Sequence, residues 1–227
     1  MMGDRLIFKA KIFSILAALS ALAACGGSKD PVLPGDRAPI FKSGDLKVLD
    51  KDPGDLGAAL ESEKCDYRID GANMIWSGGE RIFAGLPTES EIAVNKDVIC
   101  RRNFIYAGLS TGELVKVNAK TRRMEWAADI FAARLPTGGY PFMDIIAAPI
   151  YNKGFVYAGG LGGAFCKVRD SDGKKIWCIP ISVQSTICAT EKFNVIRSAS
   201  GETFVIDTGG RIYGGAEGEA RAKTCLK

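Results

Sequence analysis

The stretch FIYAGLSTGELVKVNAKTRRMEW, residues 104–126, returns 51 residues later as FVYAGGLGGAFCKVRDSDGKKIW, residues 155–177. An aromatic start, a glycine, a Lys-Val pair and a final Trp recur in the same register in both copies. Each copy begins with a β-branched and aromatic run that ends in small residues, which is typical of a β-strand. A repeat of this length indicates that the chain is built from copies of one supersecondary unit.

Two shorter copies flank this pair, YRIDGANMIW at residues 67–76 and FVIDTGGRIY at residues 204–213. Every copy contains an alternating strand, a polar turn that closes a hairpin, and a strand that carries an aromatic residue. In the middle copies the preceding strand and an innermost run, such as residues 98–100 or 148–150, complete the unit. About four strands per unit of roughly 35–50 residues predict an all-β fold, a β-propeller of four-stranded blades.

The aromatic residue that ends each copy is predicted to have a structural role. A flat ring between adjacent blades buries a large apolar area. We therefore expect blade-to-blade packing from the recurring aromatic residues, Trp76, Trp126, Trp177 and Tyr213.

The N-terminal stretch MMGDRLIFKAKIFSILAALSALAAC, residues 1–25, combines a basic start with an apolar run at residues 12–24. About thirteen apolar residues are too few to span a bilayer comfortably and are typical of a signal peptide. The small residues before Cys25 resemble the bacterial lipobox, in which the cysteine is lipidated and the chain is cut just before it. The prediction is a signal peptide with its helix at residues 1–24 and a lipid anchor, palmitate included, on Cys25.

The residues after Cys25 are rich in small and polar types and predict a flexible tether over residues 25–45. The propeller domain then occupies residues 46–227. Gly26 stands where an aspartate would, by resemblance to bacterial sorting signals, retain the protein at the inner membrane. We therefore expect a body anchored by acyl chains on the periplasmic face of the outer membrane.

Composition excludes several functions. The chain has no histidine, which excludes a Ser-His-Asp or Cys-His catalytic unit and a histidine zinc site. Its net charge of +4 is too mild for a dedicated nucleic-acid binder. We therefore predict a protein that is not an enzyme, with no metal, no cofactor and no nucleic-acid partner.

Six cysteines follow Cys25, an even number that allows disulfides in an exported protein. If Asp170 pairs with Lys174 across their hairpin, Cys166 and Cys178 face each other, and a cross-strand disulfide becomes geometrically feasible; a register one step different breaks it. A second hypothesis joins Cys65 to Cys225, because the first and last units meet if the propeller closes.

The repeats resemble those of the pyrroloquinoline-quinone enzyme superfamily over about residues 64–214. The shared features are a strand that ends in Tyr-x-Gly, a turn, and a Trp, although Arg122 and Arg123 replace the usual Gly-Lys of the turn. With a lipoprotein signal in front, the chain is similar to the propeller lipoproteins of the outer-membrane β-barrel assembly machinery. That resemblance implies an interaction scaffold for the assembly and insertion of β-barrel proteins, with the barrel-assembly subunits as partners.

The same resemblance points to one partner-binding loop. The segment FMDIIAAP, residues 142–149, lies where that family has an Asp-x-Asp loop, and it keeps Asp144 while Ile146 replaces the second aspartate. Tyr140 and Phe142, which precede Asp144 in the sequence, are further binding candidates. They also carry the main alternative function, a periplasmic propeller that binds a glycan or a small ligand.

Two questions stay open at this level. The family usually closes eight blades, and the residues after the tether provide about four. A four-bladed ring, a homodimer of half-rings that pair through exposed strand edges, and a degraded gene product all fit. The remaining functional alternative is a remnant of a quinone-dependent dehydrogenase, which would need a calcium ion held by acidic and amide oxygens.

Overall fold

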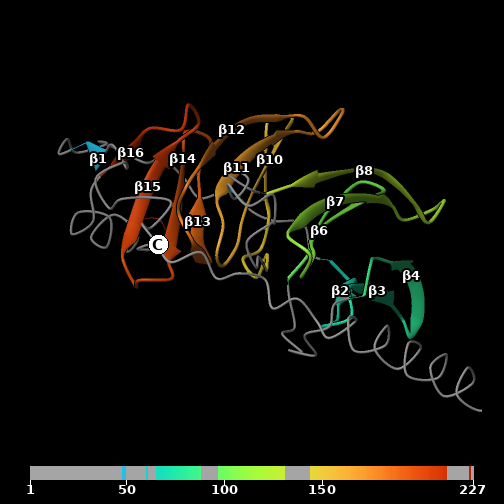
Figure 1. Ribbon diagram of the computed structural model, residues 1–227. Coiled ribbons are helices and arrows are strands. Elements are labelled where there is room, and N and C mark those ends of the chain that lie inside the picture. The colour runs from blue at the N-terminus through green and yellow to red at the C-terminus, as the bar shows by residue number, and fades with distance from the viewer. Residues whose placement is uncertain are drawn as a thin grey trace, which may run out of the picture. The chain divides into compact units, whose positions relative to one another are not determined.

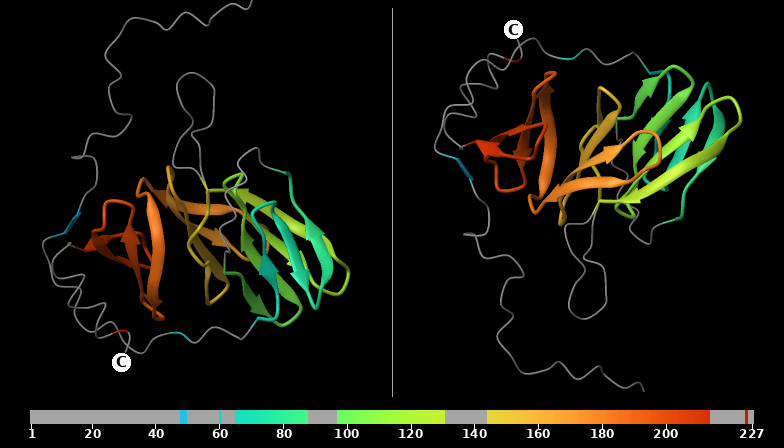
Figure 2. Two further views of the ribbon diagram at one scale, coloured as in Figure 1. Left: turned by 90° about the horizontal axis from the view of Figure 1, so that it is seen from below. Right: turned by 90° about the horizontal axis from the view of Figure 1, so that it is seen from above.

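The computed structural model describes residues 48–49, 60, 65–87, 97–130, 144–213 and 225. This part of the chain folds into strands that form four sheets, one after another along the sequence (Figures 1 and 2). The predicted signal peptide and the tether lie outside the described residues. None of the described residues belongs to a helix with the length and apolar character needed to cross a membrane.

The first three sheets are antiparallel. The first has three strands, β2 (Arg68–Ile69), β3 (Met74–Ser77) and β4 (Glu80–Ala84). The second has four, β5 (Ile99–Arg101), β6 (Phe104–Gly108), β7 (Glu113–Asn118) and β8 (Arg123–Asp129). The third repeats this plan with β9 (Ile150–Asn152), β10 (Phe155–Gly159), β11 (Phe165–Arg169) and β12 (Lys175–Ile179).

The last sheet differs from the others by a parallel strand at its edge. Its antiparallel part consists of β13 (Val183–Ala189), β14 (Phe193–Ser198), β15 (Thr203–Asp207) and β16 (Ile212–Tyr213). The distant β1 (Val48–Leu49) pairs with the outer edge of β16 in parallel. The predicted all-β propeller fold is confirmed: the second and third sheets have four strands each, the first has three among the described residues, and β1 adds a fifth to the last.

The 51-residue repeat in the sequence corresponds to a repeated pattern of strand pairing. Tyr106 lies opposite Lys116, which lies opposite Trp126, and the third sheet repeats this row 51 residues later. In both sheets the pairing slips by one residue just beyond the Trp, where Glu125 and Ile176 are the extra residues. Such a bulge bends the strand and changes the direction of its side chains. Because both sheets have it at the same place, the Trp side chain has the same orientation in both.

Apolar side chains between neighbouring sheets form the core. Ile75 meets Ile105 and Val117 between the first and second sheets, and Ile130, Ile145 and Val156 lie between the second and third. Between the third and last sheets the largest buried residues include Tyr157, Phe165, Ile196 and Ile206. Each fully buried side chain of this size contributes about 1.5–3 kcal/mol of transfer free energy. Burial between sheets is therefore what holds the sheets together.

The small residue that ends FIYAG and FVYAG allows a close approach between sheets. A Cβ on Gly159 would lie 2.7 Å from the side chain of Val183, the first residue of β13. A Cβ on Gly108 would collide with the side chain of Ile145. Glycine is required at both positions because the next segment of chain occupies the space of a side chain.

The structure pairs all six cysteines that follow Cys25. Cys166 and Cys178 are joined across β11 and β12, where the register places them directly opposite each other. The hypothesis of a link between Cys65 and Cys225 is wrong. Cys65 is joined to Cys100 of β5, and Cys225 is joined to Cys188 of β13. Cys65 and Cys225 are thus each bonded to a cysteine in the sheet against which they lie.

Candidate functional site

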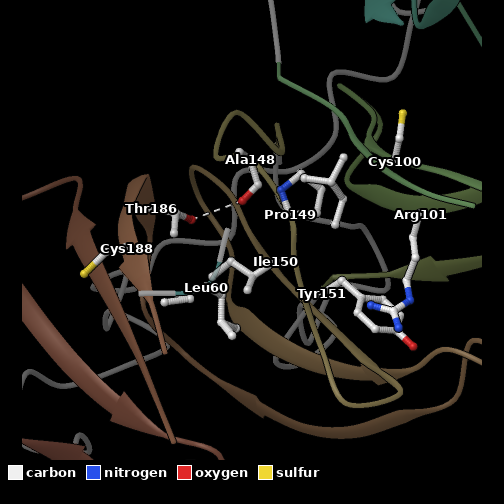
Figure 3. A pocket seen from close by; sticks show the side chains of 11 residues that line it. Leu60, Cys100, Arg101, Ala148, Pro149, Ile150, Tyr151, Thr186 and Cys188 are labelled. Atoms are coloured by element: carbon white, nitrogen blue, oxygen red, sulfur yellow. Dashed lines mark hydrogen bonds between the residues drawn. The ribbon is translucent and has the colours of Figure 1, made fainter. Parts of the chain in front are cut away.

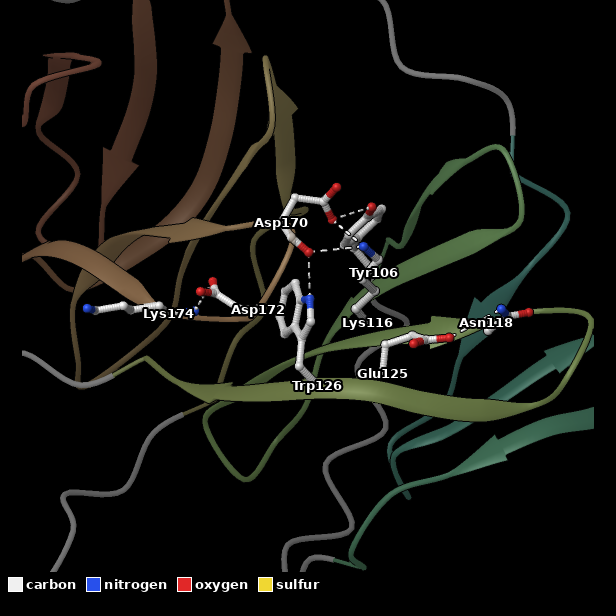
Figure 4. A network of polar contacts seen from close by, with 8 residues as sticks. All are labelled: Tyr106, Lys116, Asn118, Glu125, Trp126, Asp170, Asp172 and Lys174. Carbon is white, nitrogen blue, oxygen red and sulfur yellow. Dashed lines mark hydrogen bonds and ion pairs between the residues drawn. The ribbon is translucent and has the colours of Figure 1, made fainter.

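Three side chains of the second sheet converge on one turn of the third sheet (Figure 4). Lys116 Nζ donates to Asp170 Oδ1 at 2.7 Å and to the Asp170 carbonyl oxygen at 3.0 Å. Trp126 Nε1 donates to that carbonyl at 2.8 Å, and the Tyr106 hydroxyl donates to Asp170 Oδ1 at 2.7 Å. We call this set of contacts the first clasp. It fixes the turn with directional hydrogen bonds as well as apolar packing.

The first clasp is shielded from water. The side chains of Lys116 and Asp170 are 9% and 23% exposed, and the ammonium lies 4.3 Å from the centre of the Phe104 ring. The Trp126 ring lies against Gly173, where φ is +71° and an added Cβ would come within 2.9 Å of the indole. A side chain at this position would therefore be strained and would also displace the ring.

An equivalent second clasp joins the third sheet to the last. Lys167 Nζ donates to the carbonyl oxygen of Thr208 at 2.8 Å, and Trp177 Nε1 donates to the same oxygen at 3.3 Å. The Trp177 ring lies against Gly210, where φ is +89°. The two clasps use the same residue types 51 positions apart, so they are the physical expression of the sequence repeat.

Burial changes the acid–base behaviour of these groups. Burial raises the pKa of Tyr157 to about 12, and the negative charge of Asp207 adds to the rise. Burial also raises the pKa of Tyr106, with further contributions from its hydrogen bond to Asp170 and from the charge of that carboxylate. Burial lowers the pKa of Lys167, opposed by the charge of Asp207. Both tyrosines therefore act as neutral hydroxyl groups at neutral pH.

The innermost strands β5, β9 and β13 line a cavity of about 240 Å³ (Figure 3). Most of its lining is apolar and comes from Leu60, Ile99, Ala148, Pro149, Ile150 and Ala189. Arg101 and Tyr151 supply polar groups at one side, with the guanidinium carbon 4.1 Å from the centre of the ring. An apolar wall with a few polar groups is the usual character of a small-ligand site.

The described residues hold no group of three or more His, Cys, Asp or Glu side chains that could bind a metal ion.

The predicted partner-binding residues are only partly described by the structure. Cys25, Tyr140 and Phe142 lie outside the described residues. Asp144 is 7% exposed, and its backbone forms an antiparallel bridge with Leu161. The position of Asp144 therefore leaves little of its side chain for a partner to contact.

The four recurring aromatic residues divide into two kinds. Trp126 and Trp177 lie between sheets, but Trp76 donates its Nε1–H to Asp70 Oδ2 within its own hairpin, at 2.8 Å. The Tyr213 hydroxyl similarly donates to Asp207 Oδ2 at 3.4 Å. The hydrogen bonds of Trp76 and Tyr213 therefore stay within one hairpin, whereas those of Trp126 and Trp177 reach the next sheet.

The shorter turn explains this difference. In the first and last hairpins the aspartate that opens the turn accepts backbone N–H bonds from the residues two and four positions later. The bond from the residue two positions later is that of an Asx turn. The second carboxylate oxygen of the aspartate then accepts from the aromatic residue across the hairpin.

Sequence reasoning did not assign a role to Lys116 or Lys167, and it interpreted Asp170 only as a residue of the hairpin turn. A signal was present, because a lysine recurs in the same place within an apolar strand, flanked by valine in both copies. A cation at a buried position needs an acceptor in a neighbouring element. No comparable signal pointed to Arg101 and Tyr151, which meet only because two different sheets bring them together.

No model of a known protein family matches the chain, and no curated protein matches it. Solved structures do. BamB from Moraxella catarrhalis is 13% identical with a TM-score of 0.46, and the match covers 68% of this chain and 49% of that one. The computationally designed Ika8 protein is 15% identical with a TM-score of 0.45, covering 64% and 44%.

A quinohemoprotein alcohol dehydrogenase, ADHIIG from Pseudomonas putida HK5, is 21% identical with a TM-score of 0.41, covering 59% of this chain and 22% of that one. The chain thus spans about half or less of the length of each of these proteins.

Proposed function

We propose that the chain is a lipid-anchored outer-membrane protein whose propeller serves as an interaction scaffold in the assembly and insertion of β-barrel proteins. The observation that carries the proposal is the pairing of all six cysteines after Cys25. Disulfides persist in oxidising compartments such as the bacterial periplasm. A lipobox at Cys25 would deliver the protein to that same compartment.

The clasps support a scaffold role. Each one ties a whole sheet to the turn of the next through a lysine and a tryptophan, so the described sheets hold their loops in fixed positions. Loops carried on a rigid framework are the usual place for binding. In this proposal the partners are the barrel-assembly subunits implied by the resemblance of the repeats, and the protein has no cofactor and no chemistry of its own.

The test is recovery of partners from the native envelope. The tagged, lipidated protein is purified in mild detergent and its companions are identified by mass spectrometry. We expect barrel-assembly subunits, and we expect their yield to fall when Tyr140 and Phe142 are both changed to alanine. Met124→Ala is the matched control, because Met124 is a large apolar residue, 50% exposed, on the outer strand β8. Recovery of the bait alone would contradict the proposal.

The cavity favours a second candidate function, the binding of a small periplasmic ligand. Its apolar lining and the stacked pair of Arg101 and Tyr151 suit a compact molecule with an apolar body and an acceptor group. Native mass spectrometry of protein purified from the envelope tests it. A bound mass that is present in the wild type and lost in Arg101→Gln would support this function, and an unliganded wild type would oppose it.

A further inference from the structure

The last sheet carries different side chains on the face that forms the clasps elsewhere. We call this the outward face, the one that meets the next sheet along the chain. In the third sheet it presents Tyr157, Lys167 and Trp177. The residues in the same register of the last sheet are Val195, Val205 and Tyr213. The last sheet therefore has neither the ammonium nor the indole N–H that grips a following turn.

Apolar residues replace the polar ones and form a cluster of their own. Phe193, Val195 and Val205 are buried there, with Ile187 and Tyr213 packed beside them. The innermost strand contributes to the same face, since Cys188 occupies the position that Ile150 holds in the third sheet. An apolar face of this size needs cover, because a surface that presents several large hydrophobic side chains to water is a site of association.

The cover comes from the chain itself. Cys225 belongs to the apolar cluster, is 5% exposed and is bonded to Cys188. The outer edge of the same sheet is covered as well, because β1 pairs with β16 there. Cys225 and β1, both outside the repeats, thus contact the last sheet on two sides, whereas the second and third sheets each present their outward face to a neighbouring sheet.

We propose that the outward face of the last sheet is a docking surface for the segment around Cys225, which acts as a cap on this face. In a repeat array each unit exposes a face that a neighbouring element covers. The disulfide holds the cap at high effective concentration, and the apolar cluster supplies the contact.

Cys225→Ser in the full chain tests the cap, compared with Cys178→Ser. The control breaks the Cys166–Cys178 bond of the third sheet and leaves the outward face of the last sheet intact. With the cap released, we expect several-fold more binding of an apolar fluorescent dye than in the control. Amide hydrogen exchange should rise in β14 and β15 and stay unchanged in β6 and β7.

A rescue experiment separates a cap from a general stabilising bond. A synthetic peptide with the sequence of residues 214–227 is oxidised onto the free Cys188 of the Cys225→Ser protein. Restored protection of β14 and β15 and loss of dye binding support the proposal. Unchanged dye binding in Cys225→Ser, or a rise in exchange spread evenly over all four sheets, overturns it.

Discussion

The third sheet and the last sheet share a backbone register and differ in what their outward faces bind. In the third sheet, Lys167 and Trp177 reach a carbonyl oxygen of the next turn. In the last sheet, Val205 and Tyr213 occupy those positions, and the face packs against Cys225. The register sets where the side chains lie, and their chemistry selects the neighbour. Directional hydrogen bonds require a particular turn as the neighbour. Apolar packing places weaker requirements on the sequence of the segment that covers the face.

The largest effect is expected from removing a tryptophan of a clasp. Trp126→Ala deletes a buried ring and its hydrogen bond to the third sheet, and should lower the free energy of unfolding by about 3–5 kcal/mol. Trp76→Ala, which affects a half-buried ring bonded within its own hairpin, should cost less than half as much. Urea denaturation of both variants checks this. Equal losses would contradict the distinction between the two kinds of aromatic position.

Breaking the ion pair of the first clasp should have the next largest effect. Asp170→Ala leaves the Lys116 ammonium buried without its counter-ion and removes the acceptor of the Tyr106 hydroxyl. We expect a loss of about 3 kcal/mol. Asp172→Ala, two residues along the same turn, removes the exposed pair with Arg169 and the hydrogen bond from the Lys174 backbone N–H, and should cost about 1 kcal/mol. Similar thermal denaturation of the two variants would show that the first clasp contributes little.

A buried amide in the last sheet offers a stabilising change. Asn194 is fully buried, and neither polar atom of its side chain has a hydrogen-bond partner among the described residues. Val156 occupies the same register position in the third sheet. Asn194→Val should therefore raise the free energy of unfolding by about 1–2 kcal/mol. A lower urea midpoint in the variant would mean that the amide has a partner that stabilises the fold.

A further effect is confined to alkaline pH. The pKa of Tyr157 is raised in the folded state from 10.0 to about 12, so the fold favours the neutral hydroxyl. Its contribution to stability is complete below pH 10.0 and is lost as the pH rises through about 12. Urea midpoints across this range should fall less steeply in Tyr157→Phe than in the wild type. Parallel pH profiles would indicate that the ring is not buried between the third and last sheets.

The sequence alone was sufficient to predict the fold and the positions of the repeats. Hydrophobic alternation and the return of Gly, Lys-Val and Trp after 51 residues define the hairpins, because each hairpin is a local structure. The opposition of Cys166 and Cys178 within one hairpin was only a feasible pairing from the sequence, because it depends on the register, which the bulge at Ile176 sets.

Contacts between distant elements were beyond sequence reasoning. The pairing of Cys65 with Cys100, of Cys188 with Cys225 and of β1 with β16 depends on which sheet each segment lies against. The cavity beside Arg101 and Tyr151 arises in the same way, from three strands that are far apart in the chain. No local pattern encodes such meetings.

The most direct measurement is the intact mass of the protein isolated from its own cell envelope, after thiol alkylation without reduction. An exported, lipid-anchored propeller predicts a chain that lacks residues 1–24, carries acyl chains on Cys25 and has no alkylated cysteine among the six that follow. A mass that retains the N-terminal segment, or that shows free thiols at those cysteines, would contradict it.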